Sequence, residues 1–101
     1  MATVEEITER MRTAVGDDSG LGKSLKFDLK NDGVIHIDGG QVTNENKPAD
    51  LTLTISKDDL EAMGKGQLDA MTAVMSGRLQ LSDMGLAMQM QPKLQQLFAR
   101  M

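Results

Sequence analysis

The chain has 101 residues, no cysteine and a formal net charge of −4 at pH 7. This length supports one domain with a single modest core, and the lack of cysteine excludes disulfides, thiol catalysis and thiolate metal sites. The basic residues are scattered and there is no tryptophan or tyrosine, so the basic stripe and stacking aromatics of a nucleic-acid-binding surface are missing.

The first predicted element is a helix over residues 1–16. Thr3 can cap its first turn while Glu6 reaches back toward the cap, as in a capping box. Gly16 can adopt the left-handed conformation that ends a helix. Apolar residues recur at spacings of three and four and form one apolar stripe, which consists of Val4, Ile7, Met11 and Val15.

Residues 24–56 predict a three-strand meander. In "SLKFDLK", "VIHID" and "DLTLTI" apolar and polar residues alternate, so each strand has one apolar face and one polar face. The "NDG" run at 31–33 is typical of a hairpin turn, because asparagine and glycine tolerate positive φ. The run "GGQVTNENKP" is expected to be a loop. These strands predict an antiparallel sheet that is covered on one side only.

Two helices are predicted over residues 57–76, the first of them capped by Ser56. A further strand over 78–82 points Leu79 and Leu81 inward. A C-terminal helical segment over 83–101 is expected to be capped by Ser82 or Asp83 and interrupted by Pro92. This order predicts a single α+β domain over residues 1–101, with one sheet layer and one helix layer.

No run has the pattern of a catalytic or metal site. "SGLGKS" (19–24) is similar to a phosphate-binding loop, but Asp17 occupies the position where that motif needs glycine, and a strand follows instead of a helix. His36 is expected to face solvent, without an orienting partner. The "DDS" run (17–19) lacks the alternating carboxylates of a calcium loop. We expect a protein that is not an enzyme and needs no metal or cofactor.

Methionine is frequent, with nine residues against two phenylalanines. Met71 and Met75, like Met84 and Met88, are four residues apart, so each pair is predicted to share one helix face. One interpretation is that methionine fills a solid core. The other is that the sheet and helices enclose a cavity, because this unbranched, polarisable side chain adapts to ligands of different shapes.

Three runs between residues 24 and 98 resemble the sterol carrier protein 2 domain family. They are "FDLKNDGVIHID", "ADLTLTISKDDLEAM" and "GKGQLDAMTAVMSGRLQLSDMGLAMQMQ". The third run is the most specific, because it combines the strand Gly77–Leu81 with the "MGLAM" helix start at Met84–Met88. A tryptophan that is common in the second strand of relatives is absent from 35–38. The chain therefore resembles a short, free-standing version of this domain.

The resemblance implies a twisted, mixed sheet of four to five strands with helices on one face and an apolar tunnel between the layers. It also implies non-catalytic binding and transfer of fatty acid, fatty acyl-CoA, sterol or a similar lipid. The polar head of the ligand is expected near the turn at 65–67. The residues expected to contact the lipid are Leu53, Ile55, Met63, Met71, Val74, Met75, Leu79, Leu81, Met84 and Met88.

The sequence also supports expectations about the location of the protein in the cell and about its partners. "MATVEEITER" lacks the basic start and apolar core of a signal peptide, and "FARM" is not a peroxisomal tripeptide, so a cytoplasmic monomer is expected. Its partners would be a lipid and, transiently, a membrane, but not nucleic acid. The alternative is a protein-interaction or accessory module with a filled core and no lipid ligand.

Overall fold

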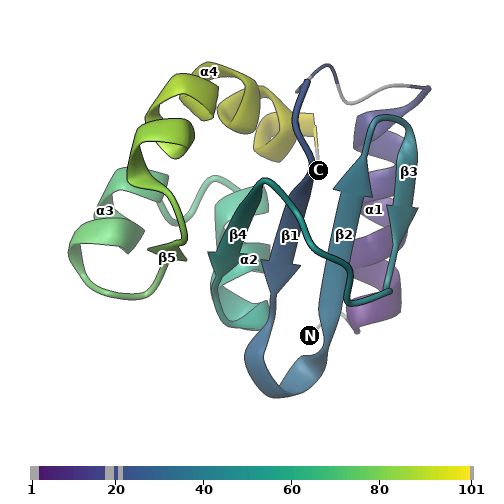
Figure 1. The fold of residues 1–101 in the computed structure, drawn as a ribbon. Coiled ribbons are helices and arrows are strands. Elements are labelled where there is room, and N and C mark those ends of the chain that lie inside the picture. Colours follow the sequence, from purple (N-terminus) through teal and green to yellow (C-terminus); the bar gives the residue numbers. More distant parts are fainter. Residues whose placement is uncertain (1–2, 18–19, 21, 101) are drawn as a thin grey trace.

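A computed structural model describes residues 3–17, 20 and 22–100, and shows a five-stranded sheet with helices against one face (Figure 1). The strands are β1 (Leu25–Asp28), β2 (Val34–Asp38), β3 (Gln41–Thr43), β4 (Leu51–Thr54) and β5 (Gln80–Leu81). The helices are α1 (Val4–Val15), the short 3-10 turn η1 (Lys30–Asp32), α2 (Lys57–Gly64), α3 (Ala70–Met75) and α4 (Met84–Arg100). The predicted α+β class and mixed sheet are confirmed.

The strand order is β3-β2-β1-β4-β5, and it differs from the predicted three-strand meander. β4 does not follow β2 in the sheet but lies beside β1 and parallel to it, with Leu51 opposite Leu25. The remaining neighbours are antiparallel, and β3 adds a strand at the edge of β2. The sheet thus has five strands. The additional strand is β3, which comes from residues predicted as a loop. The chain after Gln91 forms no strand and is helical up to Arg100.

The parallel pairing of β1 and β4 depends on residues 44–50, which cross the sheet face opposite the helices (Figure 1). Lys26 Nζ donates to Asn46 Oδ1 over 3.1 Å, and His36 Nε2 lies 3.1 Å from the Pro48 carbonyl oxygen. His36 is therefore only 5% exposed, and the prediction that it faces solvent is wrong. The segment covers part of the polar face that the alternation predicted to be open.

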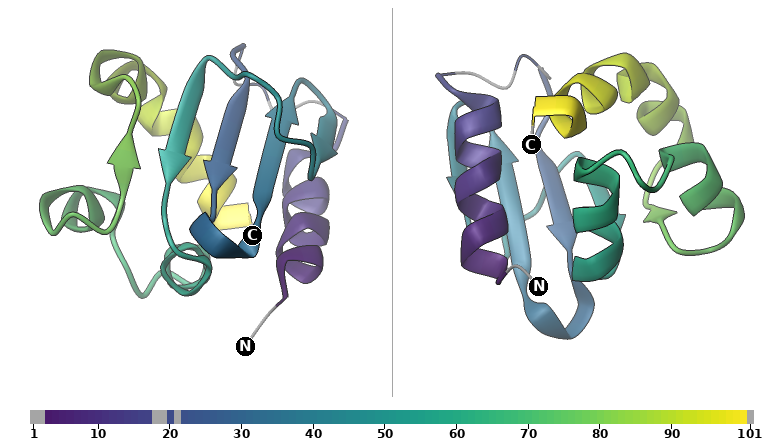
Figure 2. Two further views of the ribbon diagram at one scale, coloured as in Figure 1. Left: turned by 60° about the horizontal axis from the view of Figure 1, so that its bottom comes forward. Right: turned by 180° about the vertical axis from the view of Figure 1, so that it is seen from behind.

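The core lies between the sheet and the helix layer, which Figure 2 shows from behind the sheet. Alternate side chains of the strands point into it, and Phe27 of β1 contacts Phe98 of α4 edge to face, with ring centroids 6.1 Å apart. The stripe of α1 packs here as predicted, with Val4 partly buried. The fully or almost fully buried residues of β1, β2, β4 and the positions directly after β1 and β4 are Leu25, Phe27, Leu29, Ile35, Ile37, Leu51, Leu53 and Ile55.

Helix caps follow the sequence signals. The side chains of Thr3 and Ser56 each accept a hydrogen bond from the backbone N–H three residues later, over 3.1 Å. Asp83 caps α4, because its Oδ1 accepts from the Leu86 N–H over 3.0 Å. Ser82 has another role, since its Oγ accepts from the Thr52 N–H over 2.9 Å and extends the pairing of β4 with the segment after β5. The choice left open between Ser82 and Asp83 is thus resolved in favour of Asp83.

Two local predictions need correction. The turn between β1 and β2 places positive φ at Lys30 (61°) and Gly33 (121°), not at Asn31. α4 continues through Pro92 without interruption. Because proline has no N–H, the Met88 carbonyl cannot receive the bond that residue 92 donates in a regular helix. The helix thus remains continuous but lacks one backbone hydrogen bond in the turn between Met88 and Pro92.

Candidate functional site

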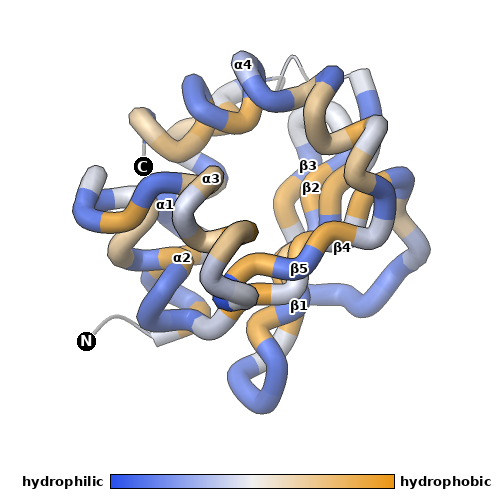
Figure 3. Tube along the Cα trace, turned by 90° about the vertical axis from the view of Figure 1, so that its left-hand side faces the viewer, coloured by the Kyte–Doolittle hydropathy of each residue, from blue (hydrophilic) through white to orange (hydrophobic). Residues whose placement is uncertain are grey.

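An apolar cavity of about 280 Å³ lies where β4 and β5 meet α3 and α4. Figure 3 shows this side of the molecule, where apolar and more polar residues alternate along β4 and β5 next to α3 and α4. Gln91 and Gln95 are the only polar residues in its lining. The lining residues are Leu53, Ala70, Met71, Val74, Leu79, Leu81, Met84, Ala87, Met88, Gln91, Leu94, Gln95 and Phe98.

Local structure positions the cavity walls. Leu53 of β4 and Leu81 of β5 are register partners, so both side chains lie on the same side of the sheet. α3 begins at the Asp69 cap, whose Oδ2 accepts from the Thr72 N–H over 3.2 Å. Its residues Met71 and Val74, three apart, contribute one wall. α4, which begins directly after β5, contributes the other.

Seven of the ten predicted contact residues line this cavity, and three lie elsewhere. Ile55 is 1% exposed and belongs to the packed core beyond the end of β4. Met63 lines a neighbouring cavity under α2. Met75, at the last position of α3, is 82% exposed and points into solvent. The structure therefore brings together Leu53, Met71, Val74, Leu79, Leu81, Met84 and Met88.

Six lining residues were not predicted, and most belong to α4. The cavity side of this helix follows spacings of three and four from Met84 to Phe98, which is the ordinary signature of one helix face. The spacing is visible in the sequence, but an expected interruption at Pro92 hides its continuation to Leu94, Gln95 and Phe98. The six residues are Ala70, Ala87, Gln91, Leu94, Gln95 and Phe98.

A second cavity, of about 450 Å³, adjoins the first and is more polar. It contains the turn after α2, where the head of a ligand was expected. Lys65 lines this cavity, and its Nζ forms an ion pair with Glu61 Oε1 over 3.4 Å. The two cavities share three lining residues, Ala70, Gln95 and Phe98. The apolar cavity thus adjoins one whose lining includes both an ammonium group, of Lys65, and a carboxylate, of Asp69.

Large apolar side chains also reach the surface here. Met71 is 53% exposed, Met84 51%, Met88 66% and Met75 82%. Three of these four side chains line the apolar cavity, so they form its boundary with solvent. Patches of exposed apolar surface on a protein often mark binding sites. We refer to Met71, Met75, Met84 and Met88 as the methionine patch.

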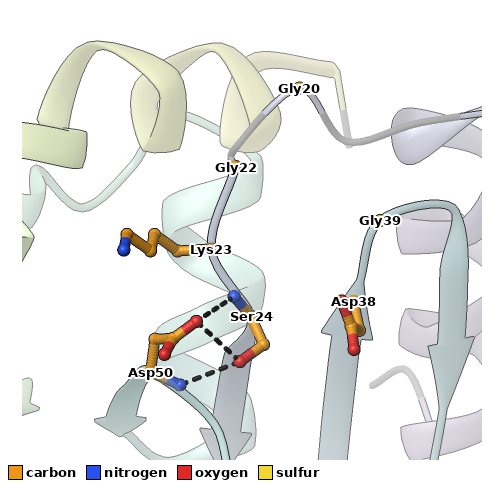
Figure 4. Close-up of a pocket in the computed structure, with 7 residues that line it drawn as sticks. All are labelled: Gly20, Gly22, Lys23, Ser24, Asp38, Gly39 and Asp50. Carbon is orange, nitrogen blue, oxygen red and sulfur yellow. Dashed lines mark hydrogen bonds between the residues drawn. The ribbon is translucent and has the colours of Figure 1, made fainter.

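A third cavity, of about 510 Å³, lies where the chain enters β1 and β4 and leaves β2, and is shown in Figure 4. The Asp50 carboxylate accepts from the Ser24 N–H (2.9 Å) and hydroxyl (3.1 Å), and Ser24 Oγ accepts from the Asp50 N–H (2.8 Å). The hydrogen bond from the Ser24 backbone is the main cause that lowers the pKa of Asp50. These groups bind each other and hold the first residues of β1 and β4 together.

Two of the motifs considered in the sequence, the phosphate-binding loop and the metal site, can be checked in the described residues. Residues 22–24 lead into β1, so the chain there does not open a helix as a phosphate-binding loop must. Part of that run and part of 17–19 lie outside the described residues. Among residues 3–17, 20 and 22–100, no three metal-ligating side chains come together, and none of the helices is long and apolar enough to cross a membrane.

Comparison with known proteins adds an independent finding. A family profile described as the SCP-2 sterol transfer family matches residues 4–95. The crystal structure of sterol carrier protein 2 like 2 from Aedes aegypti superposes with a TM-score of 0.74 at 22% identity, and covers 91% of this chain and 93% of that one. Apo sterol carrier protein 2 from Yarrowia lipolytica gives 0.70 at 22% identity, with coverage of 92% and 90%.

A third similar structure is the sterol carrier protein domain 2 of Helicoverpa armigera, solved in solution. It gives a TM-score of 0.62 at 26% identity, and the match covers 95% of this chain and 76% of that chain. Comparison with curated protein sequences gives no match. The arrangement of sheet and helices is therefore one that sterol carrier structures share.

Proposed function

This chain belongs to the SCP-2 sterol transfer family, and we propose from that membership that it is a non-catalytic carrier of a fatty acid, fatty acyl-CoA, sterol or similar lipid. The observation that carries the proposal is the apolar cavity between β4, β5, α3 and α4. An ionic metabolite would find no charged side chain in this lining. An apolar chain would find almost continuous hydrocarbon and thioether contact.

The proposed position of the ligand follows from the two adjoining cavities. The apolar part would lie against the seven predicted residues that line the smaller cavity. Each buried methylene contributes roughly 0.8 kcal/mol before the cost of ordering the ligand, so a chain of about ten methylenes gives substantial affinity. Methionine side chains with several rotatable bonds suit ligands of different shape, which favours broad specificity.

We place the polar head in the second cavity, beside Lys65. A lipid that occupies both cavities would pass between Ala70, Gln95 and Phe98, and a small displacement of Phe98 or Gln95 would join the two spaces into one tunnel. Lys65 already pairs with Glu61, so a carboxylate or phosphate head would compete with that pair. The carrier would act in the cytoplasm as a monomer and contact membranes transiently to exchange its cargo.

The first test is whether lipid binds at all. Native mass spectrometry of protein purified from cells should reveal a co-purified lipid. Titration with palmitate, palmitoyl-CoA and cholesterol should shift backbone NMR signals of α3, β5 and the first half of α4. Absence of both signals would favour the alternative, an interaction or accessory module without a lipid ligand, and capture of one stoichiometric protein partner would support that alternative.

A pair of methionine variants tests the location. Met88→Trp fills part of the cavity mouth and should weaken lipid binding by at least about tenfold, which corresponds to about 1.4 kcal/mol. Met75→Trp makes the same change at a side chain that does not line the cavity, and should bind lipid as the wild type does. Circular dichroism confirms that both variants fold. Equal affinities of the wild type and both variants would remove Met88 from the site.

A further inference from the structure

Gln91 is a polar residue at the centre of a mostly apolar helix face. The face of α4 that lines the smaller cavity has seven residues at spacings of three and four, and Gln91 is the fourth of them. Its neighbours on this face, one turn before and one turn after, are Ala87, Met88, Leu94 and Gln95. A cavity for hydrocarbon alone is expected to have an apolar residue at the centre of this face, so the amide indicates a different ligand chemistry.

The Gln91 amide is available to a ligand. Its N–H and carbonyl groups form no side-chain hydrogen bond within residues 3–17, 20 and 22–100. The side chain is half-buried, so solvent reaches it while the cavity holds no lipid. A lipid that fills the cavity displaces this solvent, and an unsubstituted acyl chain offers the amide no hydrogen bond in return. Loss of hydration without a replacement weakens binding.

Gln95, one turn later, has a different position. It lines both cavities, so its amide lies at their boundary, near the place proposed for the polar head. Gln91 lines only the smaller cavity, about 6 Å farther along the helix axis. The head of a lipid therefore lies closer to Gln95, whereas Gln91 lies beside the chain. A hydrogen-bonding group that reaches Gln91 belongs to the apolar part of the ligand.

We propose that Gln91 makes this carrier selective for acyl lipids with a hydroxyl group within the chain, away from the head. A hydroxyl both donates and accepts hydrogen bonds, so it can pair with either group of the carboxamide. The group must be uncharged, because no charged side chain is among the described residues that line the smaller cavity, and an ion would lose its hydration there. The inference rests on the proposed carrier function and adds to it the class of substrate.

The experiment compares ligands of the same length by isothermal titration calorimetry with the full chain. The ligands are stearate, 2-hydroxystearate and the mid-chain isomers 10- and 12-hydroxystearate. We expect a mid-chain isomer to bind several-fold more tightly than stearate, because its hydroxyl replaces the solvent at Gln91. The hydroxyl of 2-hydroxystearate lies next to the head, so this ligand should bind as stearate does.

A pair of glutamine variants tests the residue. Gln91→Leu replaces the amide by hydrocarbon of similar size and should bind stearate at least as tightly as the wild type does. Its affinity for a mid-chain isomer relative to stearate should fall by about tenfold, which corresponds to about 1.4 kcal/mol. Gln89→Leu makes the same change at an exposed position of α4 that does not line the cavity, and should keep the wild-type ratio. Retained stearate binding shows that Gln91→Leu folds with its cavity intact.

The side-chain NMR signals of the wild type provide a second measurement that needs no variant. The NH2 signals of Gln91 should shift with a mid-chain isomer and change much less with stearate. If stearate binds but neither mid-chain isomer binds more tightly, or if Gln91→Leu keeps the wild-type ratio, the proposed selectivity is wrong while the carrier function stands. If none of the four ligands binds, the carrier function and the selectivity both fail.

Discussion

Methionine occupies two kinds of position in this chain, and each uses a different property of the side chain. Met11 is fully buried and Met63 and Met90 are nearly so, which is the gap-filling role that methionine has in many cores. The four residues of the methionine patch are more than half exposed, and three of them line the apolar cavity instead of filling the core. Residue type alone does not distinguish the buried methionines from the exposed ones. Their positions on the helices do.

Asp50 shows how one exposed carboxylate can stabilise a strand pairing. Its folded pKa is lowered, chiefly by the hydrogen bond from the Ser24 backbone, so its contribution to stability is present above the ordinary value of 3.8 and is lost as pH falls through the folded pKa. Asp50→Asn should therefore lower the free energy of unfolding at neutral pH, and the difference from the wild type should shrink once the pH is below 3.8.

Urea unfolding of the two proteins at neutral and acidic pH checks this. Asp32→Asn removes an exposed carboxylate from the β1–β2 turn and controls for the change in net charge. If the difference in free energy of unfolding between the wild type and Asp50→Asn does not change with pH, the Ser24–Asp50 contact does not depend on the charge of the carboxylate.

At the scale of elements, α4 combines a continuous helix with an internal proline. Pro92→Ala supplies the missing N–H to the Met88 carbonyl and should raise the free energy of unfolding by about 1–3 kcal/mol. Amide hydrogen exchange should slow in the turn around residues 88–92, beside the cavity. Lys93→Ala, at an exposed neighbouring position, controls for helix propensity. Unchanged exchange in Pro92→Ala would show that the carbonyl has another donor.

Most elements could be predicted from the sequence because their signals are local. The Ser56 cap, the α1 stripe and the alternation of β1, β2 and β4 each depend on residues a few positions apart. The neighbour of β4 could not be predicted in this way, since alternation is the same in parallel and antiparallel pairs. β3 has three residues and one buried side chain, Val42, which is too short to show a period.

The site was predictable to a similar extent. The cavity residues before α4 follow from inward alternation and helical spacing, and all of them except Ala70 were predicted. Spacing also predicted that Met75 accompanies Met71, but α3 ends at Met75, where no further turn of helix packs over the side chain. Of the α4 residues, Met84 and Met88 were predicted, whereas Leu94, Gln95 and Phe98 were not, because proline usually ends a helix. Which residues enclose a space depends on long-range packing that no local pattern contains.

At the scale of the whole molecule, stability is distributed unevenly between the sheet and the cavity. β1, β2 and β4 each bury alternate side chains completely, whereas only Ala73 of the six α3 residues is buried. We expect α3 amides to exchange through local opening, at a free energy well below that of global unfolding, and lipid to slow this exchange. Hydrogen-exchange mass spectrometry measures both.

The strand amides provide the internal reference for that measurement. Exchange in β1 and β2 should require global unfolding and should change little with lipid. If α3 and β1 exchange with the same free energy, the cavity wall does not open independently, and ligand uptake needs another route. Slower exchange in α3 with lipid, and not in the strands, would indicate that this wall moves when cargo enters.

The exposure of the methionine patch has a chemical consequence. Thioethers in contact with solvent are oxidised by peroxide to sulfoxides, which are polar and chiral, whereas buried ones are protected. Among the methionines that the structure describes, we expect peptide mapping after mild peroxide treatment to find Met75 and Met88 modified first and Met11 last. Sulfoxides at the cavity mouth would weaken contact with acyl chains while the folded core stays intact. Oxidative stress would thereby stop delivery of cargo well before it destroyed the protein, and a sulfoxide reductase would restore it.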